Sequence, residues 1–149
     1  MKEALDKAFG QSDMVMIESM LEGMEISQGV YKTKDKAVVF PATEVVSEND
    51  FFDFDAKYNG QVQEITPARL PQDVAERVAK ITSTIYDILH ANGIIRVDYI
   101  ISNPQSSDAK INMLEINTTP GMTPTSFIPQ QVRAASLDMG EVLSEIVEN

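Results

Sequence analysis

IIRVDYII at residues 94–101 and KINMLEIN at residues 110–117 are the two stretches that decide the fold expected for this chain. Both are rich in isoleucine and largely alternate apolar with polar side chains, as strands do when one face is buried. Between them, SNPQSSDA at residues 102–109 consists mostly of residues that favour turns. The sequence therefore predicts an antiparallel hairpin.

Period-two geometry places Arg96 and Asp98 on one face of the first strand. On the second strand, the same geometry predicts that Glu115 and Asn117 share a face with Ile111 and Met113. The length of the turn then places Arg96 roughly opposite Glu115, with Asp98 diagonal to it. Two carboxylates, an amide and a guanidinium are expected on one surface.

Such a cluster requires a positive charge. Two carboxylates ~5 Å apart repel by roughly 3 kcal/mol at an effective dielectric constant of ~20. Arg96 can neutralise one of them, and a divalent metal ion can neutralise both. The oxygen ligands of Asp98, Glu115 and Asn117 suit Mg²⁺, or Mn²⁺, rather than zinc or copper. From spacing alone, a salt-bridge network around Arg96 is an equal alternative.

The loop after the second strand favours the metal site. It reads NTTPG at residues 117–121, and a loop that contains glycine can present backbone N–H groups to an anion. An anion beside a set of oxygen ligands is the arrangement that a metal–phosphate complex needs.

The longest predicted helix begins at Pro71, a favoured first-turn residue, and ends at Asn92-Gly93. Its apolar side chains are spaced so that they form one stripe, which is expected to face the core. That stripe consists of Val74, Val78, Ile81, Ile85, Ile88 and Leu89.

The other elements complete an α+β fold, mainly an antiparallel sheet packed with helices. Strands are predicted at 14–18, 24–31 and 37–46, the last two as a hairpin with Pro41 at an edge or a bulge. An ordered loop is predicted at 47–66 and a Thr-, Pro- and Gly-rich loop at 118–125. Helices are predicted at 2–9, 126–134 and 137–147.

Length and composition exclude several classes of protein. With 149 residues, a single domain over 1–149 is expected. A formal net charge of −11 disfavours nucleic acid as a partner. No cysteine is present, so disulfides and thiolate metal sites are excluded. The first ten residues lack the apolar stretch of a signal peptide, and no apolar run approaches the ~20 residues that span a bilayer. A cytoplasmic protein without a membrane partner is expected.

Several motifs together resemble a known family. Arg96-Val97-Asp98, followed by LEINTTPGMTPTS at residues 114–126, is similar to the closing motif of the ATP-grasp superfamily. DAKY at residues 55–58 and the detailed sequence of the loop resemble the corresponding segments of D-alanine–D-alanine ligases. The match runs in consistent order over nearly the whole chain. It implies the C-terminal lobe of an ATP-grasp domain.

The resemblance implies a reaction and a catalytic centre. ATP would phosphorylate one D-alanine, and the amine of a second D-alanine would attack the acyl phosphate, in the synthesis of peptidoglycan precursors. Asp98, Glu115 and Asn117 would hold two Mg²⁺ ions that bridge the nucleotide phosphates. Arg96 and the backbone N–H of Gly121 would stabilise the oxyanion of the tetrahedral intermediate.

The resemblance also implies residues that bind the second substrate. Ser126 and the N–H of Phe127 would hold the carboxylate of the second D-alanine at a helix N-terminus. Lys57 would reach the ATP phosphates, and Tyr58 would brace its loop over this substrate site. Without the family, Ser126 reads as an ordinary N-cap and the Lys57-Tyr58 pair as solvent-facing loop residues.

At the nucleotide end, the resemblance implies that Glu18 and the backbone near Leu21 meet the adenine, and that Glu25 binds the ribose hydroxyls. Read alone, these acids are charges at strand ends. Ser19 stands where many relatives have a lysine, which weakens the expected contacts.

The chain departs from the family in extent. A full ligase is considerably longer, with a preceding substrate domain and a Gly-rich phosphate loop, and no Gly-x-Gly pattern occurs here. The chain is therefore expected to be a C-terminal fragment with little or no activity of its own, whose partner is the missing N-terminal part. A homodimer is one expected assembly of the full-length enzyme.

Two other functions remain open from the sequence. One is an ATP-grasp carboxylate–amine ligase with a different acceptor, which the Lys57-Tyr58 pair argues against. The other is a non-catalytic acidic module that binds divalent cations or a partner protein.

Overall fold

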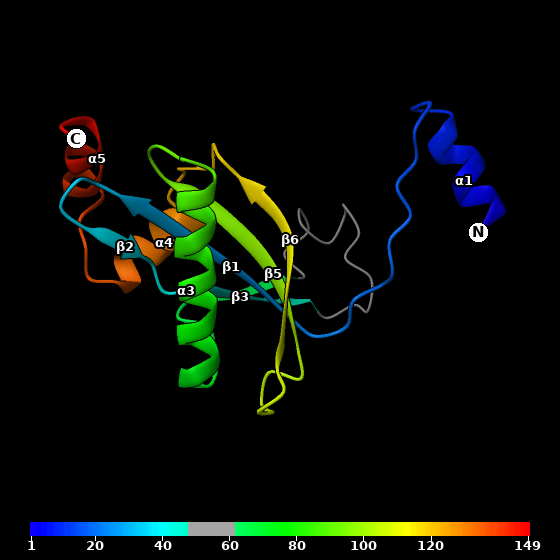
Figure 1. The fold of residues 1–149 in the computed structure, drawn as a ribbon, viewed down its shortest axis with the longest axis horizontal. Helices are drawn as coiled ribbons and strands as arrows, with labels where there is room; N and C mark the ends of the chain where they lie inside the picture. Colours follow the sequence, from blue (N-terminus) through cyan, green and yellow to red (C-terminus); the bar gives the residue numbers. More distant parts are fainter. Residues whose placement is uncertain (48–61) are drawn as a thin grey trace.

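The computed structural model describes residues 1–47 and 62–149 of the chain. These residues form a six-stranded antiparallel sheet in the order β4–β3–β1–β5–β6, and β2 also pairs with β1 (Figure 1). The strands are β1 Met24–Lys32, β2 Ala37–Val39, β3 Thr43–Ser47, β4 Val62–Ile65, β5 Ile95–Ser102 and β6 Lys110–Asn117.

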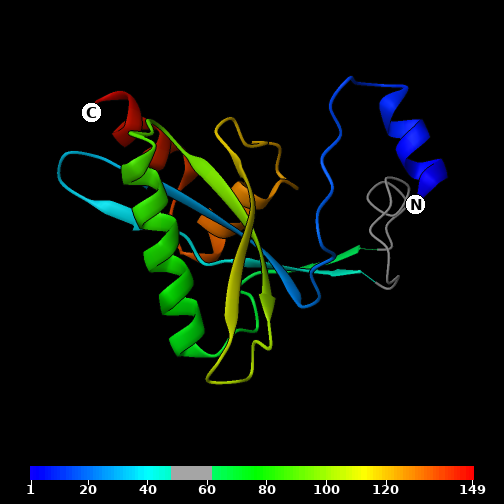
Figure 2. The same ribbon diagram turned by 45° about the vertical axis from the view of Figure 1, so that its right-hand side comes forward.

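Helices cover both faces of the central strand β1. Helix α3 (Gln72–Ile88) crosses one face of the sheet, and α4 (Phe127–Ala134) packs on the other, next to α5 (Met139–Val147) (Figures 1 and 2). Side chains of β1 alternate between the face covered by α3 and the face covered by α4. Ile26 and Val30 belong to the cluster under α3, whereas Tyr31 belongs to the cluster with α4 and α5. The expected α+β class, with an antiparallel sheet packed by helices, is confirmed.

The hairpin predicted from residues 94–117 is present as β5 and β6, and the helix predicted from Pro71 is present as α3. The predicted apolar stripe of α3 is only partly correct. Val74 and Val78 are buried, but Ile81, Ile88 and Leu89 are exposed.

Thr82 and Tyr86, which carry hydroxyl groups, are buried on α3, whereas the sequence predicted buried isoleucine and leucine side chains. Thr82 hydrogen-bonds Tyr99 Oη at 2.8 Å, and the Tyr86 hydroxyl donates to Gly93 O at 3.1 Å. Because each hydroxyl finds a partner, both side chains can be buried without an unsatisfied polar group. Burial also raises the pKa of Tyr99 to about 12.

The strand predicted at 24–31 is confirmed, whereas the one at 37–46 is split into β2 and β3. Pro41 lies in the break, because proline cannot donate a hydrogen bond to the ladder. The strand predicted at 14–18 is wrong, since these residues form no regular element and Met14, Met16 and Ile17 are exposed. Alternation alone does not make a strand where no partner strand is paired with it.

The three remaining helices agree with their predicted positions within two residues. Helix α1 (Lys2–Phe9) has no buried side chain and stands apart from the sheet (Figure 1). Strand β4 lies inside the stretch predicted as a loop. In the described ranges, no helix combines the length and the apolar character required to cross a membrane.

Candidate active site

The hairpin brings Asp98 and Glu115 directly opposite each other, and Arg96 opposite Asn117. The sequence had instead predicted Arg96 opposite Glu115. The difference comes from a register shift between Asp98 and Tyr99. Such a β-bulge sets an extra residue of one strand against its partner.

The bulge also changes which side chains of β6 share a face. Tyr99 pairs with Met113 and Asp98 with Glu115, so Leu114 is the extra residue. Ile111 packs against the core cluster that contains Tyr99, whereas Glu115 lines a cavity on the opposite side. The prediction that Ile111 shares a face with Glu115 is therefore wrong.

Arg96 binds Asp98 through two hydrogen bonds, from Nε to Oδ1 at 3.0 Å and from Nη2 to Oδ2 at 2.8 Å. Its Nη2 also lies 3.8 Å from Glu115 Oε1. The side chains of Arg96 and Asp98 are 18% and 13% exposed, against 68% for Glu115. The Ser27 hydroxyl donates a further hydrogen bond to Asp98 Oδ1 at 2.6 Å.

Phe127 contacts the same guanidinium. Arg96 Cζ lies 5.3 Å from the centroid of the Phe127 ring, within the range of a cation–π interaction. Sequence reasoning gave Phe127 only a backbone role. The structure adds a side-chain contact that holds Arg96 from a second direction.

Ser126 is the residue before α4, but its hydroxyl does not cap the helix. Instead it hydrogen-bonds Thr123 Oγ1 at 2.7 Å. A Cβ atom at Gly121 would lie 2.8 Å from Ser126 Oγ, closer than side chains normally approach. A side chain at position 121 would therefore force the Ser126 hydroxyl out of its observed position.

A cavity of about 1060 Å³ collects most of the predicted site residues. It brings together Glu18, Leu21 and Glu25 from the nucleotide end with Arg96, Asp98, Glu115, Ser126 and Phe127. Asn117 and Gly121 do not line it. The Asn117 side chain accepts a hydrogen bond from Thr119 N at 3.0 Å. Lys57 and Tyr58 lie outside the described residues.

Several lining residues escaped sequence reasoning. Glu64 is the most relevant of them, and its carboxylate accepts a hydrogen bond from Gln130 Nε2. The alternation of VQEI at 62–65 was the available signal, but this stretch was interpreted as part of a loop. The other unpredicted lining residues are Met16, Val45, Ile100, Met113, Leu114 and Thr123.

The side-chain oxygens of Asp98, Glu115 and Asn117 are of the chemical kind that Mg²⁺ prefers in proteins. Within residues 1–47 and 62–149, no group of three or more His, Cys, Asp or Glu could hold a metal by itself. The candidate set is two paired carboxylates, Asp98 and Glu115, with the amide oxygen of Asn117. Mg²⁺ usually takes one or two carboxylates and completes its octahedron with water and substrate phosphates.

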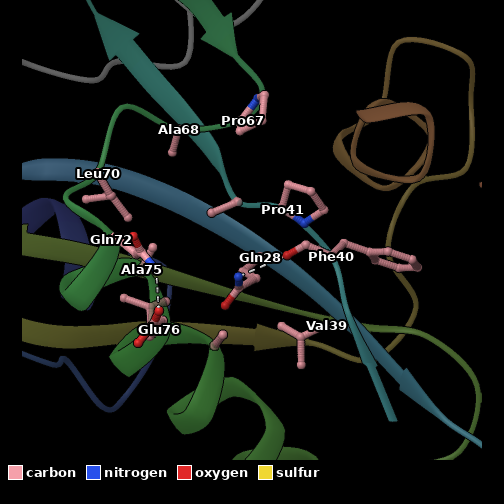
Figure 3. Close-up of a pocket in the computed structure, with 13 residues that line it drawn as sticks. Gln28, Val39, Phe40, Pro41, Pro67, Ala68, Leu70, Gln72, Ala75 and Glu76 are labelled. Carbon is pink, nitrogen blue, oxygen red and sulfur yellow. Dashed lines mark hydrogen bonds between the residues drawn. The ribbon is translucent and has the colours of Figure 1, made fainter. Parts of the chain in front are cut away.

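A second, smaller cavity of about 370 Å³ lies between α3 and the segments around Pro41 and Pro67 (Figure 3). Its lining is mostly apolar. The Gln28 amide inside it donates to Phe40 O at 3.0 Å, and the Glu76 carboxylate accepts from Gln72 at 2.9 Å. None of the predicted site residues reaches this cavity.

The family model described as D-ala D-ala ligase C-terminus matches residues 1–148 of the chain. The chain belongs to this family. The D-alanine–D-alanine ligase of Phocaeicola vulgatus is 64% identical over 146 residues, which are 98% of this chain and 44% of the relative. The ligase of Bacteroides fragilis is 61% identical over the same shares. The chain thus spans less than half the length of these family members.

Solved structures of family members share the fold. The D-alanine–D-alanine ligase of Bacillus anthracis has a TM-score of 0.76 and 28% identity, covering 99% of this chain and 46% of that one. A second structure of this enzyme is a complex with ATP. The VanG D-Ala:D-Ser ligase of Enterococcus faecalis has a TM-score of 0.80 and 26% identity, covering 99% of this chain and 42% of that one.

Proposed function

We propose that this chain forms the C-terminal part of an ATP-dependent ligase that joins two D-alanines through an acyl phosphate, for peptidoglycan precursor synthesis. One observation carries the proposal: Asp98 and Glu115 are direct partners on adjacent strands and face a cavity that Ser126 and Phe127 also line. Membership in the ligase family, with relatives at 53–64% identity named as D-alanine–D-alanine ligases, supports it.

The charge of the cavity argues for a metal-dependent nucleotide site. Its described lining includes the carboxylates of Glu18, Glu25, Glu64, Asp98 and Glu115, but only one guanidinium, that of Arg96. An ATP polyanion would be repelled by such a surface unless cations accompanied it. Lys57 is proposed to provide one positive charge at the phosphates.

Asp98, Glu115 and Asn117 would hold Mg²⁺, with Mn²⁺ as an alternative. When bound, the metal would neutralise the charge that develops on the phosphates during transfer. The protein's contribution is the fixed position of these ligands. Asp98 is held by hydrogen bonds from two side chains, so it is oriented before any ligand arrives.

Arg96 would stabilise the oxyanion of the tetrahedral intermediate together with the N–H of Gly121. Its contact with the Phe127 ring and its bonds to Asp98 restrict the guanidinium to the cavity wall. A preorganised cation of this kind does not have to reorient when negative charge develops.

The carboxylate of the second D-alanine would bind at the start of α4, to the Ser126 hydroxyl and the Phe127 N–H. Free N–H groups at a helix N-terminus favour an anion. Ser126 Oγ is bonded to Thr123 rather than to the helix backbone, so capping does not occupy it. Tyr58 is proposed to cover this site.

Glu18 and the backbone near Leu21 would contact adenine, and Glu25 would bind the ribose hydroxyls.

We place the enzyme in the cytoplasm, where ATP is supplied. These 149 residues alone are expected to have little or no activity, because catalysis requires both substrates to be positioned and the relatives use more than twice this length. The remaining part of the ligase is the proposed partner, and the whole enzyme is proposed to be able to form a homodimer.

Calorimetry on the ligase that contains this chain tests the proposal. ATP should bind with Mg²⁺ present and should bind at least about tenfold more weakly without it. Asp98→Asn and Glu115→Gln should remove this dependence on Mg²⁺, whereas Asp87→Asn, a carboxylate paired with Lys32 on the surface, should not. Magnesium binding that is indifferent to ATP would instead favour an acidic cation-binding module.

A substrate assay tests the acceptor. Dipeptide formation should be faster with D-alanine as acceptor than with D-serine or D-lactate. A preference for D-lactate or another acceptor would indicate a different carboxylate–amine ligase.

A further inference from the structure

A row of polar side chains crosses the sheet through Asp98 and ends at Glu115. Ser27 on β1 is the strand partner of both Thr43 on β3 and Asp98 on β5. Glu115 on β6 is the next partner in this row. The row therefore connects the sheet interior to the two carboxylates proposed to hold the metal.

Ser27 is the member of this row that touches the site. It is 1% exposed, and its hydroxyl donates to Asp98 Oδ1 at 2.6 Å. A distance of this size is typical of a hydroxyl bonded to an ionised carboxylate, which is stronger than a bond between neutral groups. Removing the hydroxyl would take from Asp98 Oδ1 a hydrogen bond made on the buried side of the carboxylate.

The position of Ser27 is itself fixed by Gln131, a fully buried residue of α4. The Gln131 amide donates to Ser27 O at 2.8 Å and to Thr43 Oγ1 at 3.1 Å. Its oxygen accepts from Gly29 N at 2.8 Å. Two of these bonds tie the helix that begins next to Ser126 to the strand that carries Ser27, and the third ties it to β3.

The two donors on Asp98 come from different strands. Arg96 is on β5 itself and partly exposed, whereas Ser27 is on the neighbouring strand and buried. Oδ1 accepts from both side chains and Oδ2 accepts from Arg96 Nη2, so rotation of the carboxylate is restricted, while Oδ2 keeps a second lone pair for a cation. Ser27 thus adds a buried anchor on a second strand to the contacts that Arg96 makes.

We propose that Ser27 is a positioning residue that fixes the orientation of the Asp98 carboxylate for metal binding. This inference rests on the proposed function. Ser27 does not line the cavity, so it acts through Asp98 and not by contact with a substrate. Partners that orient metal ligands typically contribute 10–100-fold to metal affinity.

Mn²⁺ binding tests the inference without measuring turnover. The ligase containing this chain is saturated with a non-hydrolysable ATP analogue, and free Mn²⁺ is followed by electron paramagnetic resonance during titration. Ser27→Ala should weaken Mn²⁺ binding about tenfold, and Ser27→Thr, which keeps the hydroxyl, should stay within about threefold of the parent. Circular dichroism checks that each variant is folded.

Thr82→Val is the matched control. It also removes a buried hydroxyl from the same domain, but Thr82 bonds Gln28 and Tyr99 on the opposite face of the sheet. Its Mn²⁺ affinity should equal that of the parent. If Ser27→Ala does not fold, Ser27→Cys replaces it, because a thiol of similar size is a weak donor.

The outcomes separate the two proposals. A parent enzyme that binds no Mn²⁺ with the analogue would overturn the proposed function, and this inference with it. A parent that binds Mn²⁺, with a folded Ser27→Ala or Ser27→Cys variant of equal affinity, would overturn only the role of Ser27. An equal loss in Thr82→Val would also overturn it, because the effect would then be general destabilisation.

Discussion

Asp98 and Glu115 are paired across β5 and β6 immediately before a bulge that shifts the register of the two strands. The extra residue, Leu114, turns Glu115 and Asn117 to the face of Asp98, while Ile111 stays on the core face. A shift of one residue moves a whole strand segment from one face to the other. The bulge therefore decides whether the two carboxylates face each other across the hairpin.

Deleting Leu114 should abolish metal binding. Without the extra residue, either Glu115 turns away from Asp98 or the core packing of Ile111 is lost. Mn²⁺ titration of the ligase containing this chain measures the effect. Deleting Ser107, in the exposed turn between β5 and β6, is the control and should leave affinity within about threefold. Unchanged affinity after the Leu114 deletion would show that the bulge does not set the site.

Phe127→Ala should reduce kcat about 3- to 10-fold, because Arg96 loses the ring that holds its guanidinium. The backbone N–H at this position is retained, so the KM for the second D-alanine should change little. Phe127→Tyr keeps an aromatic face and should restore most of the rate. Steady-state kinetics with varied D-alanine distinguish the two parameters, and a rise in KM alone would contradict a role through Arg96.

Gly121→Ala should raise the KM for the second D-alanine about tenfold, because the added methyl group would collide with Ser126 Oγ. Ser126→Ala removes Oγ, the atom with which the added methyl group would collide. In that background, Gly121→Ala should therefore have much less effect, and the double-mutant cycle should show strong coupling. Additive effects of the two changes would place Gly121 and Ser126 in independent roles.

The ionisation of Glu44 should make the stability of the folded chain depend on pH. Its side chain is 5% exposed and is hydrogen-bonded by Arg69, which holds the pKa of Glu44 below its ordinary value although burial opposes this. The folded state favours the ionised form, so the stabilisation is present at pH values above the ordinary pKa of glutamate and is lost as the pH falls through the lowered pKa.

Thermal unfolding at about pH 6 and about pH 3 measures this effect. The Tm of the parent should fall more between these values than the Tm of Glu44→Gln, which has no carboxyl group to protonate there. Glu148→Gln, an exposed change at the last helix, is the control and should follow the parent. An equal fall for parent and Glu44→Gln would contradict the stabilising role of the Glu44–Arg69 pair.

Local sequence patterns were sufficient to predict most of the helices and strands. The alternation of IIRVDYII and the turn residues after it predict β5 and its hairpin, and Pro71 with Asn92-Gly93 brackets α3. The same patterns failed where partners decide the outcome. Residues 14–18 have strand-like composition but form no ladder, and Thr82 is buried because Tyr99 and Gln28 meet its hydroxyl.

The sequence by itself determined the residue types of the site and the strands that carry them, because carboxylates at period-two spacing and a Gly-containing loop are local features. Only the tertiary structure decided that Asp98 faces Glu115, that Phe127 stacks on Arg96 and that Ser27 reaches Asp98. The last two contacts join elements that are not consecutive in the chain, and the first depends on the register of the hairpin. They depend on one bulge and on the packing of α4 against β1, and neither follows from any single segment.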